Sequence, residues 1–226
     1  MLRVVSYNVH GLRDDRGALV SVVRELDPDV LIVQEAPRRF RWRTRNAHLA
    51  HDLGLVYVAG GAPSLGNVIL TGLRVTPVRT WELRYPLTPG RHMRGAVFAR
   101  CTVGGAPFVV VGSHLSLDGV ERASQARLLA KALADVDVPV ILGADLNEPP
   151  GGAAWEAFDA ALVDGARGVR PAGSWATFPA AAPRQRIDTV LVSSRVEVNG
   201  YRVAADLAGA GRASDHLPVV AELALP

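Results

Sequence analysis

Short hydrophobic runs alternate with amphipathic segments along the whole chain. Residues 2–7 and 30–34 are rich in β-branched and aliphatic side chains, a composition that favours buried strands. Between these runs, apolar side chains recur at helical spacing, at Ala18, Leu19, Val22, Val23 and Leu26. Asp14 or Asp15 is placed to cap that helix, and Pro28 lies just beyond its end. The resulting strand–helix–strand unit predicts parallel pairing of its two strands.

A second unit of the same kind lies further along the chain. Residues 108–112 and 138–143 predict strands, and the Ala- and Leu-rich residues 121–133 predict the helix between them. Shorter runs separated by glycine and proline predict antiparallel strands at residues 67–71, 75–83 and 96–103, and the pattern continues at residues 187–192, 196–203 and 219–223. No linker or fixed-period repeat interrupts it. We therefore expect one domain over residues 1–226, of mixed α/β type with a large sheet content.

Polar side chains follow several of these apolar runs, at positions where burial is costly. They are Asn8, Glu35, His114, Asp145 with Asn147, and Asp215 with His216 just before the last strand. Each has a structural explanation when taken alone: Asn8 could stabilise a turn, Glu35 could pair with a neighbouring arginine, and a lone histidine is usually just hydrogen-bonded. Together they supply oxygen ligands for a hard divalent cation and acid–base groups. This set predicts a functional site in a crevice at the strand ends.

Seven short motifs occur in order along the chain. They are SYNVHGL at residues 6–12, QE at 34–35, GNVIL at 66–70, GSHL at 112–115, GADLN at 143–147, RID at 186–188 and SDH at 214–216. This order resembles the endonuclease/exonuclease/phosphatase superfamily, the metal-dependent phosphoesterases related to DNase I and exonuclease III. The resemblance covers essentially the whole chain. It implies a DNase I-like four-layer α/β/β/α sandwich, in which two mixed sheets pack face to face with helices outside and the site lies at one end of the sheets.

By this resemblance, the protein is a metal-dependent phosphoric ester hydrolase in which an activated water attacks in line. Glu35 is implied as the principal ligand for Mg²⁺ or Mn²⁺, and Asn8 and Asp215 complete or support the coordination. Asp145 is implied to orient the attacking water and to deprotonate it or accept a hydrogen bond from it. Asn147 would donate a hydrogen bond to the phosphoryl oxygens as charge develops on them.

The same resemblance implies roles for two histidines at the phosphate. His216 would contact the scissile phosphate, and Asp188 would fix its tautomer and raise its basicity. His114 matches a histidine that assists the leaving group in DNase-like and sphingomyelinase-like members. Which of Asp145, His114 and His216 is the acid and which is the base stays open at this point.

Two weaker matches and two departures accompany these motifs. Arg94 and Asn67 match positions near the site and could contact phosphate, or they could equally be a strand-edge arginine and a turn asparagine. His10 stands where apurinic endonucleases have a second acidic residue, and His114 stands where they carry tyrosine. Both departures argue against abasic-site repair and against a second metal there.

The positive charge of the chain comes almost entirely from arginine. Lys131 is the only lysine among 25 lysine and arginine residues, and the net charge is +3. Such a surplus suits a phosphate-bearing partner, but a bias towards GC-rich codons explains it equally well. Residues 37–45 hold five arginines interleaved with Phe40 and Trp42, which could grip a nucleic-acid backbone and stack on a base or sugar. The alternative, which we favour slightly, is a helix whose Phe40 packs inward while its arginines face water.

Three hypotheses of function follow. The first is a nuclease, whose partner would be a nucleic-acid phosphodiester. The second is hydrolysis of a phospholipid, an inositol phosphate or another small phosphoester, for which residues 81–89 and Trp155 are candidate exposed hydrophobic positions. The third is a non-catalytic phosphate-binding protein. It ranks last because all the central site residues are present.

Cysteine content and the N-terminal residues bear on the compartment. Cys101 is the single cysteine, which excludes an intramolecular disulfide and a thiolate metal cluster. It lies in an apolar run, so we expect an inert, buried thiol. Residues 1–7 enter strand-like sequence without the pattern of a secretory signal, and no apolar run is long enough to span a bilayer. We expect a cytoplasmic monomer without stable membrane insertion.

Overall fold

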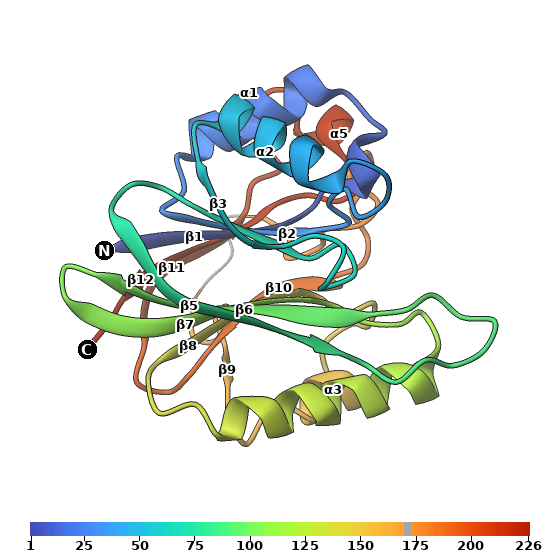
Figure 1. Ribbon diagram of the computed structural model, residues 1–226, viewed down its shortest axis with the longest axis vertical. Coiled ribbons are helices and arrows are strands. Elements are labelled where there is room, and N and C mark those ends of the chain that lie inside the picture. The colour runs from blue at the N-terminus through green and yellow to red at the C-terminus, as the bar shows by residue number, and fades with distance from the viewer. Residues whose placement is uncertain (170–172) are drawn as a thin grey trace.

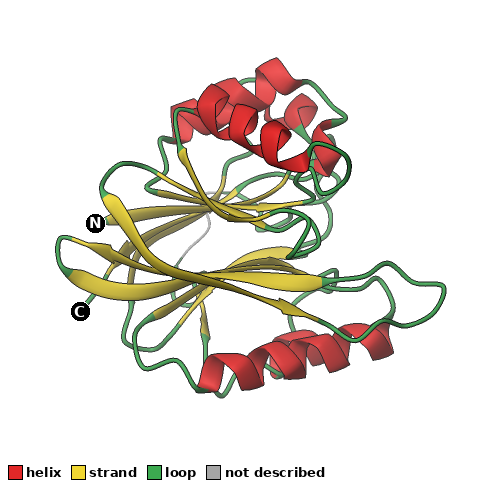
Figure 2. Cartoon of the chain, viewed as in Figure 1, coloured by secondary structure: helices red, strands yellow, loops and turns green. Residues whose placement is uncertain are grey.

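Two six-stranded mixed sheets pack face to face in the computed structural model, which describes residues 1–169 and 173–226 (Figures 1 and 2). The first sheet has the strand order β11 (Glu197–Val203), β12 (Val219–Ala224), β1 (Leu2–Asn8), β2 (Val30–Gln34), β4 (Val68–Thr71) and β3 (Val56–Gly60). The second sheet has the order β5 (Val75–Arg84), β6 (Gly95–Val103), β7 (Ala106–His114), β8 (Val140–Asp145), β10 (Asp188–Val192) and β9 (Val163–Asp164).

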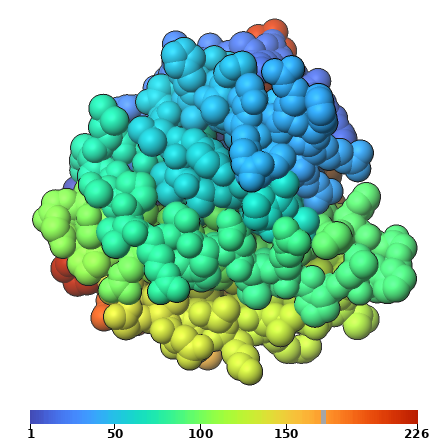
Figure 3. All heavy atoms as spheres, viewed as in Figure 1, coloured from blue at the N-terminus to red at the C-terminus, as the bar shows by residue number. Residues whose placement is uncertain are grey.

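Helices cover the outer face of each sheet. The first sheet carries α1 (Arg16–Leu26), α2 (Trp42–Leu53) and α5 (Ala210–Ala213), and the second carries α3 (Gly119–Ala134) and α4 (Ala153–Glu156). The expected four-layer α/β/β/α sandwich is confirmed. The space-filling view follows the same layers, from the blue helices through the teal and green strands to the yellow α3 (Figure 3). No helix in the described ranges has the length and apolarity needed to cross a bilayer.

Each sheet is built around one parallel pair of strands. β1 is parallel to β2, and β7 is parallel to β8 with His114 opposite Asp145. All other pairings between the described strands are antiparallel. The parallel pairing predicted from the two strand–helix–strand units is therefore confirmed. Because parallel strands end at the same edge of a sheet, the polar residues that follow them lie side by side.

Burial on both faces explains why the strand sequences are nearly continuous apolar runs. In β2, Val30 and Ile32 pack between the two sheets, whereas Leu31 and Val33 pack under the helices. In α1, all five residues at the predicted helical spacing are buried against the first sheet. The helix begins at Asp15, whose side chain accepts the N–H of Ala18 and so satisfies one of the unpaired donors of the first turn.

Two glycines allow the sheets to approach each other closely. A Cβ atom on Gly112 would lie 2.8 Å from Cγ2 of Ile32, and a Cβ atom on Gly143 would lie 2.7 Å from Cδ1 of the same residue. The Gly143 position would also meet Oγ of Ser6 at 2.9 Å. Ile32 and Ser6 belong to the facing sheet, so a methyl group at either glycine would push the two layers apart.

We expect Gly143→Ala to destabilise the protein by about 1–3 kcal/mol, because the added methyl group overpacks the interface between the sheets. Chemical denaturation followed by circular dichroism measures this change. Gly119→Ala is the matched control, because its new Cβ would lie 3.6 Å from its nearest neighbour at the start of α3. A Gly143→Ala variant as stable as the wild type would contradict close packing at this position.

The single thiol lies inside the interface between the sheets. Cys101 has no exposed surface, and burial raises the pKa of its thiol to about 12. We therefore expect no alkylation by iodoacetamide at about pH 8 in the folded protein, and one modification per chain after unfolding in denaturant. Mass spectrometry of the two samples distinguishes these outcomes. Rapid alkylation of the folded protein would show that this strand opens.

Two expectations about aromatic residues are wrong. Phe40 does not pack inward, because α2 begins only at Trp42 and the Phe40 side chain is 85% exposed. The physical reason is a turn: the N–H of Trp42 donates to the carbonyl of Arg39, and Arg41 adopts a left-handed φ of 56°. Trp155, by contrast, is buried and its indole N–H donates to a backbone carbonyl, so it is not an exposed hydrophobic position.

Candidate active site

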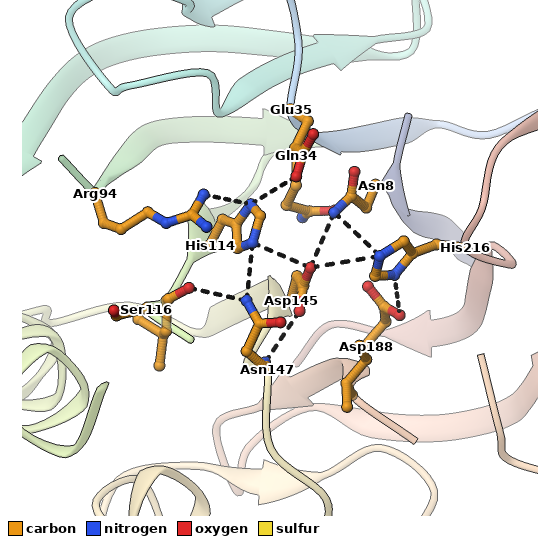
Figure 4. A network of polar contacts seen from close by, with 12 residues as sticks. Asn8, Gln34, Glu35, Arg94, His114, Ser116, Asp145, Asn147, Asp188 and His216 are labelled. Carbon is orange, nitrogen blue, oxygen red and sulfur yellow. Dashed lines mark hydrogen bonds and ion pairs between the residues drawn. The ribbon is translucent and has the colours of Figure 1, made fainter. Parts of the chain in front are cut away.

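Strand ends from both sheets bring buried polar side chains together (Figure 4). Asn8 ends β1, His114 ends β7 and Asp145 ends β8. Asp188 begins β10 and lies opposite Asp145 in the antiparallel register. All four residues are buried. Nδ2 of Asn8 donates to Oδ2 of Asp145 at 2.9 Å, and this bond crosses from the first sheet to the second.

His216 lies beside Asp188 on one side of this centre. Its Nδ1 lies 2.8 Å from Oδ2 of Asp188, and its Nε2 lies 3.5 Å from Nδ2 of Asn8 and 3.9 Å from Oδ2 of Asp145. Burial alone lowers the pKa of this imidazole. The hydrogen-bonded carboxylate of Asp188, supported by Asp145 and Asp215, outweighs burial and raises the pKa to about 9. The ring is therefore protonated at neutral pH and donates to Asp188.

His114 lies on the other side, in the opposite electrostatic environment. Its Nδ1 is 3.0 Å from a guanidinium nitrogen of Arg94, which can only donate. Its Nε2 lies 2.9 Å from Nδ2 of Asn147, which is also a donor, and 3.2 Å from Oδ2 of Asp145. Burial, followed by the charge of Arg94, holds the pKa of His114 well below its usual value. This ring is neutral at pH 7.

Asp145 lies between the two histidines and is fully buried. Burial and the charge of Asp188 raise its pKa to about 7, although the charge of His216 and hydrogen bonds from Asn8 and Asn147 oppose the shift. The backbone N–H of Asn147, a residue with a left-handed φ of 52°, donates to Oδ1 at 3.0 Å. A carboxyl group with this pKa can accept a proton near neutral pH.

Glu35 reaches the site from just beyond the end of β2. Its φ is 55°, an uncommon conformation for a residue other than glycine and one that carries a backbone cost. Its side chain is 32% exposed, and Oε1 lies 3.9 Å from Nδ1 of His114. Within residues 1–169 and 173–226, no arginine or lysine forms a salt bridge with this carboxylate. Glu35 thus presents a carboxylate that no arginine or lysine in the described part of the chain pairs with directly.

Asp215 lies on the rim of the site, next to a histidine that the sequence analysis did not include among the site residues. Its side chain is 37% exposed, and Oδ2 lies 3.8 Å from Nε2 of His10, in the short 3-10 helix η1 (His10–Leu12). Nδ1 of His10 lies 2.8 Å from Oδ2 of Asp14. The N–H of His10 donates to Oδ1 of Asn8 at 3.0 Å. His10 lies two residues after the predicted site residue Asn8 in the sequence, and this position could have identified it as a neighbour of the site.

The weaker candidate Asn67 has a structural role between the sheets. It is 1% exposed, and its Nδ2 donates to the carbonyls of Ser64 at 2.8 Å and Gly95 at 2.9 Å. These bonds tie the loop before β4 to the start of β6, and they leave no amide hydrogen for a phosphate. Arg94, the other weaker candidate, is partly buried and points to His114.

Two further neighbours of the site come from a loop that no motif marks. The hydroxyl of Thr177 donates to Oδ2 of Asp188, and the ring of Phe178 packs 4.9 Å from the ring of His216. Both residues precede β10 in sequence but reach it through irregular backbone. Because no periodic pattern covers this loop, the sequence carries no signal for these contacts.

Carboxylate and imidazole groups gather in two clusters in the described part of the chain. In each, the ligand atoms lie within 4.8 Å of one another: Asp145, Asp188 and His216 form the first, and His10, Asp14 and Asp215 form the second. The groups of the first cluster are buried and already paired, an arrangement suited to handling protons. Glu35 and Asp215 are the more exposed carboxylates, and with the Asn8 amide they are the kind of hard oxygen donor that Mg²⁺ or Mn²⁺ prefers.

The fold and the site together define a class of enzyme. Rim carboxylates can hold a divalent cation, a buried carboxyl group can take a proton from water, and a protonated imidazole can face a developing anion. These are the requirements for hydrolysis of a phosphate ester. The protein is a phosphoesterase.

The family follows from a sequence comparison. The profile of the Endonuclease/Exonuclease/phosphatase family matches residues 5–216, which is most of the chain. The protein therefore belongs to this family, whose members depend on divalent metals. A search among curated protein sequences returned no significant match.

Solved structures with the same fold include enzymes for different phosphate esters. A mannosyl-6-phosphatase from Bacteroides thetaiotaomicron superposes with a TM-score of 0.83 at 20% identity, with 100% of both chains covered. TDP2 from D. rerio, complexed with a single strand DNA product, gives 0.81 at 19% identity over 99% of this chain and 98% of that chain. The human Nocturnin catalytic domain with a bound sulfate anion gives 0.77 at 18% identity over 100% and 94%. These likenesses show the fold.

We expect Arg94→Gln to raise the pKa of His114, because it removes the cation that faces Nδ1 while keeping a hydrogen-bond donor there. Titration of the metal-free protein by histidine NMR measures the shift. Arg91→Gln is the control, because Arg91 lies in the same loop but pairs with Asp118. An unchanged His114 pKa in Arg94→Gln would show that burial alone keeps this ring neutral.

Proposed function

We propose that the protein is a nuclease that hydrolyses phosphodiester bonds with Mg²⁺ or Mn²⁺. The observation that carries this proposal is a cleft of about 620 Å³ that includes Glu35 in its lining. Its lining includes five arginines, Arg13, Arg38, Arg39, Arg45 and Arg94. So many guanidinium groups suit a substrate that carries phosphates on both sides of the bond to be broken.

In this proposal, the metal ion binds at the rim of the site. Glu35, with Asn8 and Asp215, would hold the ion. When bound, a divalent ion neutralises charge on the phosphate and lowers the pKa of a water molecule. The exposed position of both carboxylates leaves room for the waters that Mg²⁺ retains.

The buried groups act on the water and on the phosphate. Asp145 orients the attacking water and accepts its proton. The protonated ring of His216, held in place by Asp188, donates a hydrogen bond from Nε2 to a phosphate oxygen. The neutral ring of His114 lies on the opposite side of Asp145 from His216, where it assists the leaving oxygen. The amide of Asn147, which donates to the Leu115 carbonyl and lies 2.9 Å from Nε2 of His114, holds that ring in place.

A second candidate is hydrolysis of a small phosphomonoester. The mannosyl-6-phosphatase with the same fold gives this candidate its support, whereas TDP2 with its single strand DNA product supports a nucleic acid. A sugar phosphate offers one phosphate group for contact. Because the cleft presents five arginines, we rank a nucleic-acid phosphodiester first.

We expect cleavage of single-stranded DNA or RNA to require Mg²⁺ or Mn²⁺ and to stop with EDTA. Glu35→Gln removes the charge that binds the ion, and His216→Ala removes a donor to the phosphate. Each change is expected to lower the cleavage rate by about 10²-fold or more. Gel analysis of labelled oligonucleotides measures the rates, and a supercoiled plasmid, a chromogenic phosphodiester and a phosphomonoester complete the substrate panel.

Glu25→Gln is the matched control for these variants, because Glu25 is an exposed carboxylate on α1, outside the site. It should retain the wild-type rate. Full activity in Glu35→Gln or His216→Ala would overturn the mechanism. Activity confined to the phosphomonoester would instead establish the second candidate.

A further inference from the structure

A tight turn next to the cleft presents an aromatic ring to solvent. The turn runs from Arg39 to Trp42, whose N–H donates to the Arg39 carbonyl at 2.9 Å. Phe40 stands at its tip and is 85% exposed, followed by Arg41 with a left-handed φ of 56°. Folding of the chain gains almost nothing from this ring, since very little of it is buried. The ring is available to an external partner.

The turn and the first two turns of α2 surround a hollow of about 490 Å³. It is lined by Arg39, Phe40, Arg41, Thr44, Arg45 and His48. Arg39 and Arg45 also line the cleft that contains Glu35, so the two depressions share a border. The surface is therefore continuous from the cleft at Glu35 to Phe40, and Arg39, Arg41 and Arg45 line its outer part.

The arginines of this surface are not paired with carboxylates. Arg13, Arg38, Arg39, Arg41, Arg45 and Arg94 form no salt bridge with Asp or Glu within the described residues. Of the other described arginines, nine form such a salt bridge and eight do not, but these six are distinguished by lining two adjoining depressions. The first turn of α2 contains no acidic residue and has no side-chain cap. Several like charges this close to one another repel, and an anionic ligand would relieve that repulsion.

We infer that this hollow binds the single strand of nucleic acid that flanks the phosphate at Glu35, with one base stacked on Phe40. The inference rests on the proposed nuclease function. Arg39, Arg41 and Arg45 contact the backbone phosphates, and the ring supplies a flat apolar face that any base can stack on. A lipid surface fits less well, because a membrane-binding patch needs several adjacent apolar side chains and this one has a single ring among cations.

Base stacking is tested by binding, in an Asp145→Asn background with Mg²⁺ so that the strand is not consumed. Fluorescence anisotropy compares an oligothymidylate of about twelve nucleotides with an abasic strand of the same length. Phe40→Ala is expected to weaken binding of the oligothymidylate by about 5- to 100-fold and to leave the weaker binding of the abasic strand unchanged. Phe40→Trp should restore the preference for bases. Leu73→Ala, at another exposed apolar position, is the control.

The charge contribution is tested by salt dependence in the same assay. Each phosphate contact that is lost lowers the slope of log affinity against log salt by about 0.7 for a single strand. Arg41→Ala/Arg45→Ala should therefore reduce both the affinity and the slope. Arg24→Ala/Arg127→Ala removes two exposed arginines from other helices and should change neither.

The outcomes separate this inference from the proposed function. If the wild type cleaves oligonucleotides while Phe40→Ala and Arg41→Ala/Arg45→Ala bind them normally, the strand lies elsewhere and the inference is overturned. If the wild type binds anionic vesicles and no oligonucleotide, the occupant is a lipid surface and the inference is again wrong. Base-dependent binding without any cleavage would support the hollow as a strand-binding surface and overturn the nuclease proposal.

Discussion

A buried hydrogen bond between Asn8 and Asp145 joins the two sheets at the point where the chemistry takes place. It crosses a water-poor interface, where an unpaired amide or carboxyl group would be costly, so the two strand ends must stay in register with each other. This hydrogen bond therefore fixes the position of the end of β1 relative to the end of β8. His114, which ends the strand parallel to β8, and Asp188, which faces Asp145 across an antiparallel pair, are positioned as a consequence.

This arrangement gives two histidines in one small site different protonation states. His216 is surrounded by carboxylates and stays protonated, whereas His114 faces Arg94 and stays neutral. Asp145 lies between them with a pKa of about 7. The difference arises from which sheet and which loop supplies each neighbour, not from the histidines themselves. The carboxyl group of Asp145 can therefore accept a proton while a protonated ring lies on one side of it and a neutral ring lies on the other.

Periodic patterns predicted the mixed α/β class and the gathering of polar side chains at strand ends, whereas the four-layer arrangement and the roles of the site residues were predicted from the resemblance of ordered motifs to a family. The strands are short apolar runs, and the polar residues that end them are the ones that the sheets bring together. Contacts made by irregular backbone could not be predicted in this way, as with Thr177 beside Asp188 and Phe178 beside His216. The exposure of Phe40 could not be predicted for a different reason. Its hydrophobicity favoured burial, but the turn that ends in a left-handed Arg41 decides where the ring points.

The surplus of arginine, like the hydrophobicity of Phe40, can be interpreted only from where the residues lie in the fold. A coding bias would distribute arginines without regard to their partners. The nine that pair with Asp or Glu, and the eight others in the described residues that lie away from these depressions without a salt bridge, need no other explanation. The unpaired arginines around Glu35 and Phe40 differ, because mutual repulsion makes their clustering unfavourable for the folded protein alone. An acidic metal site attracts cations and repels phosphates until the ion is bound. Under the proposed function, arginines at its border would hold the phosphates that flank the scissile bond, and a bound ion would neutralise the phosphate to be cleaved.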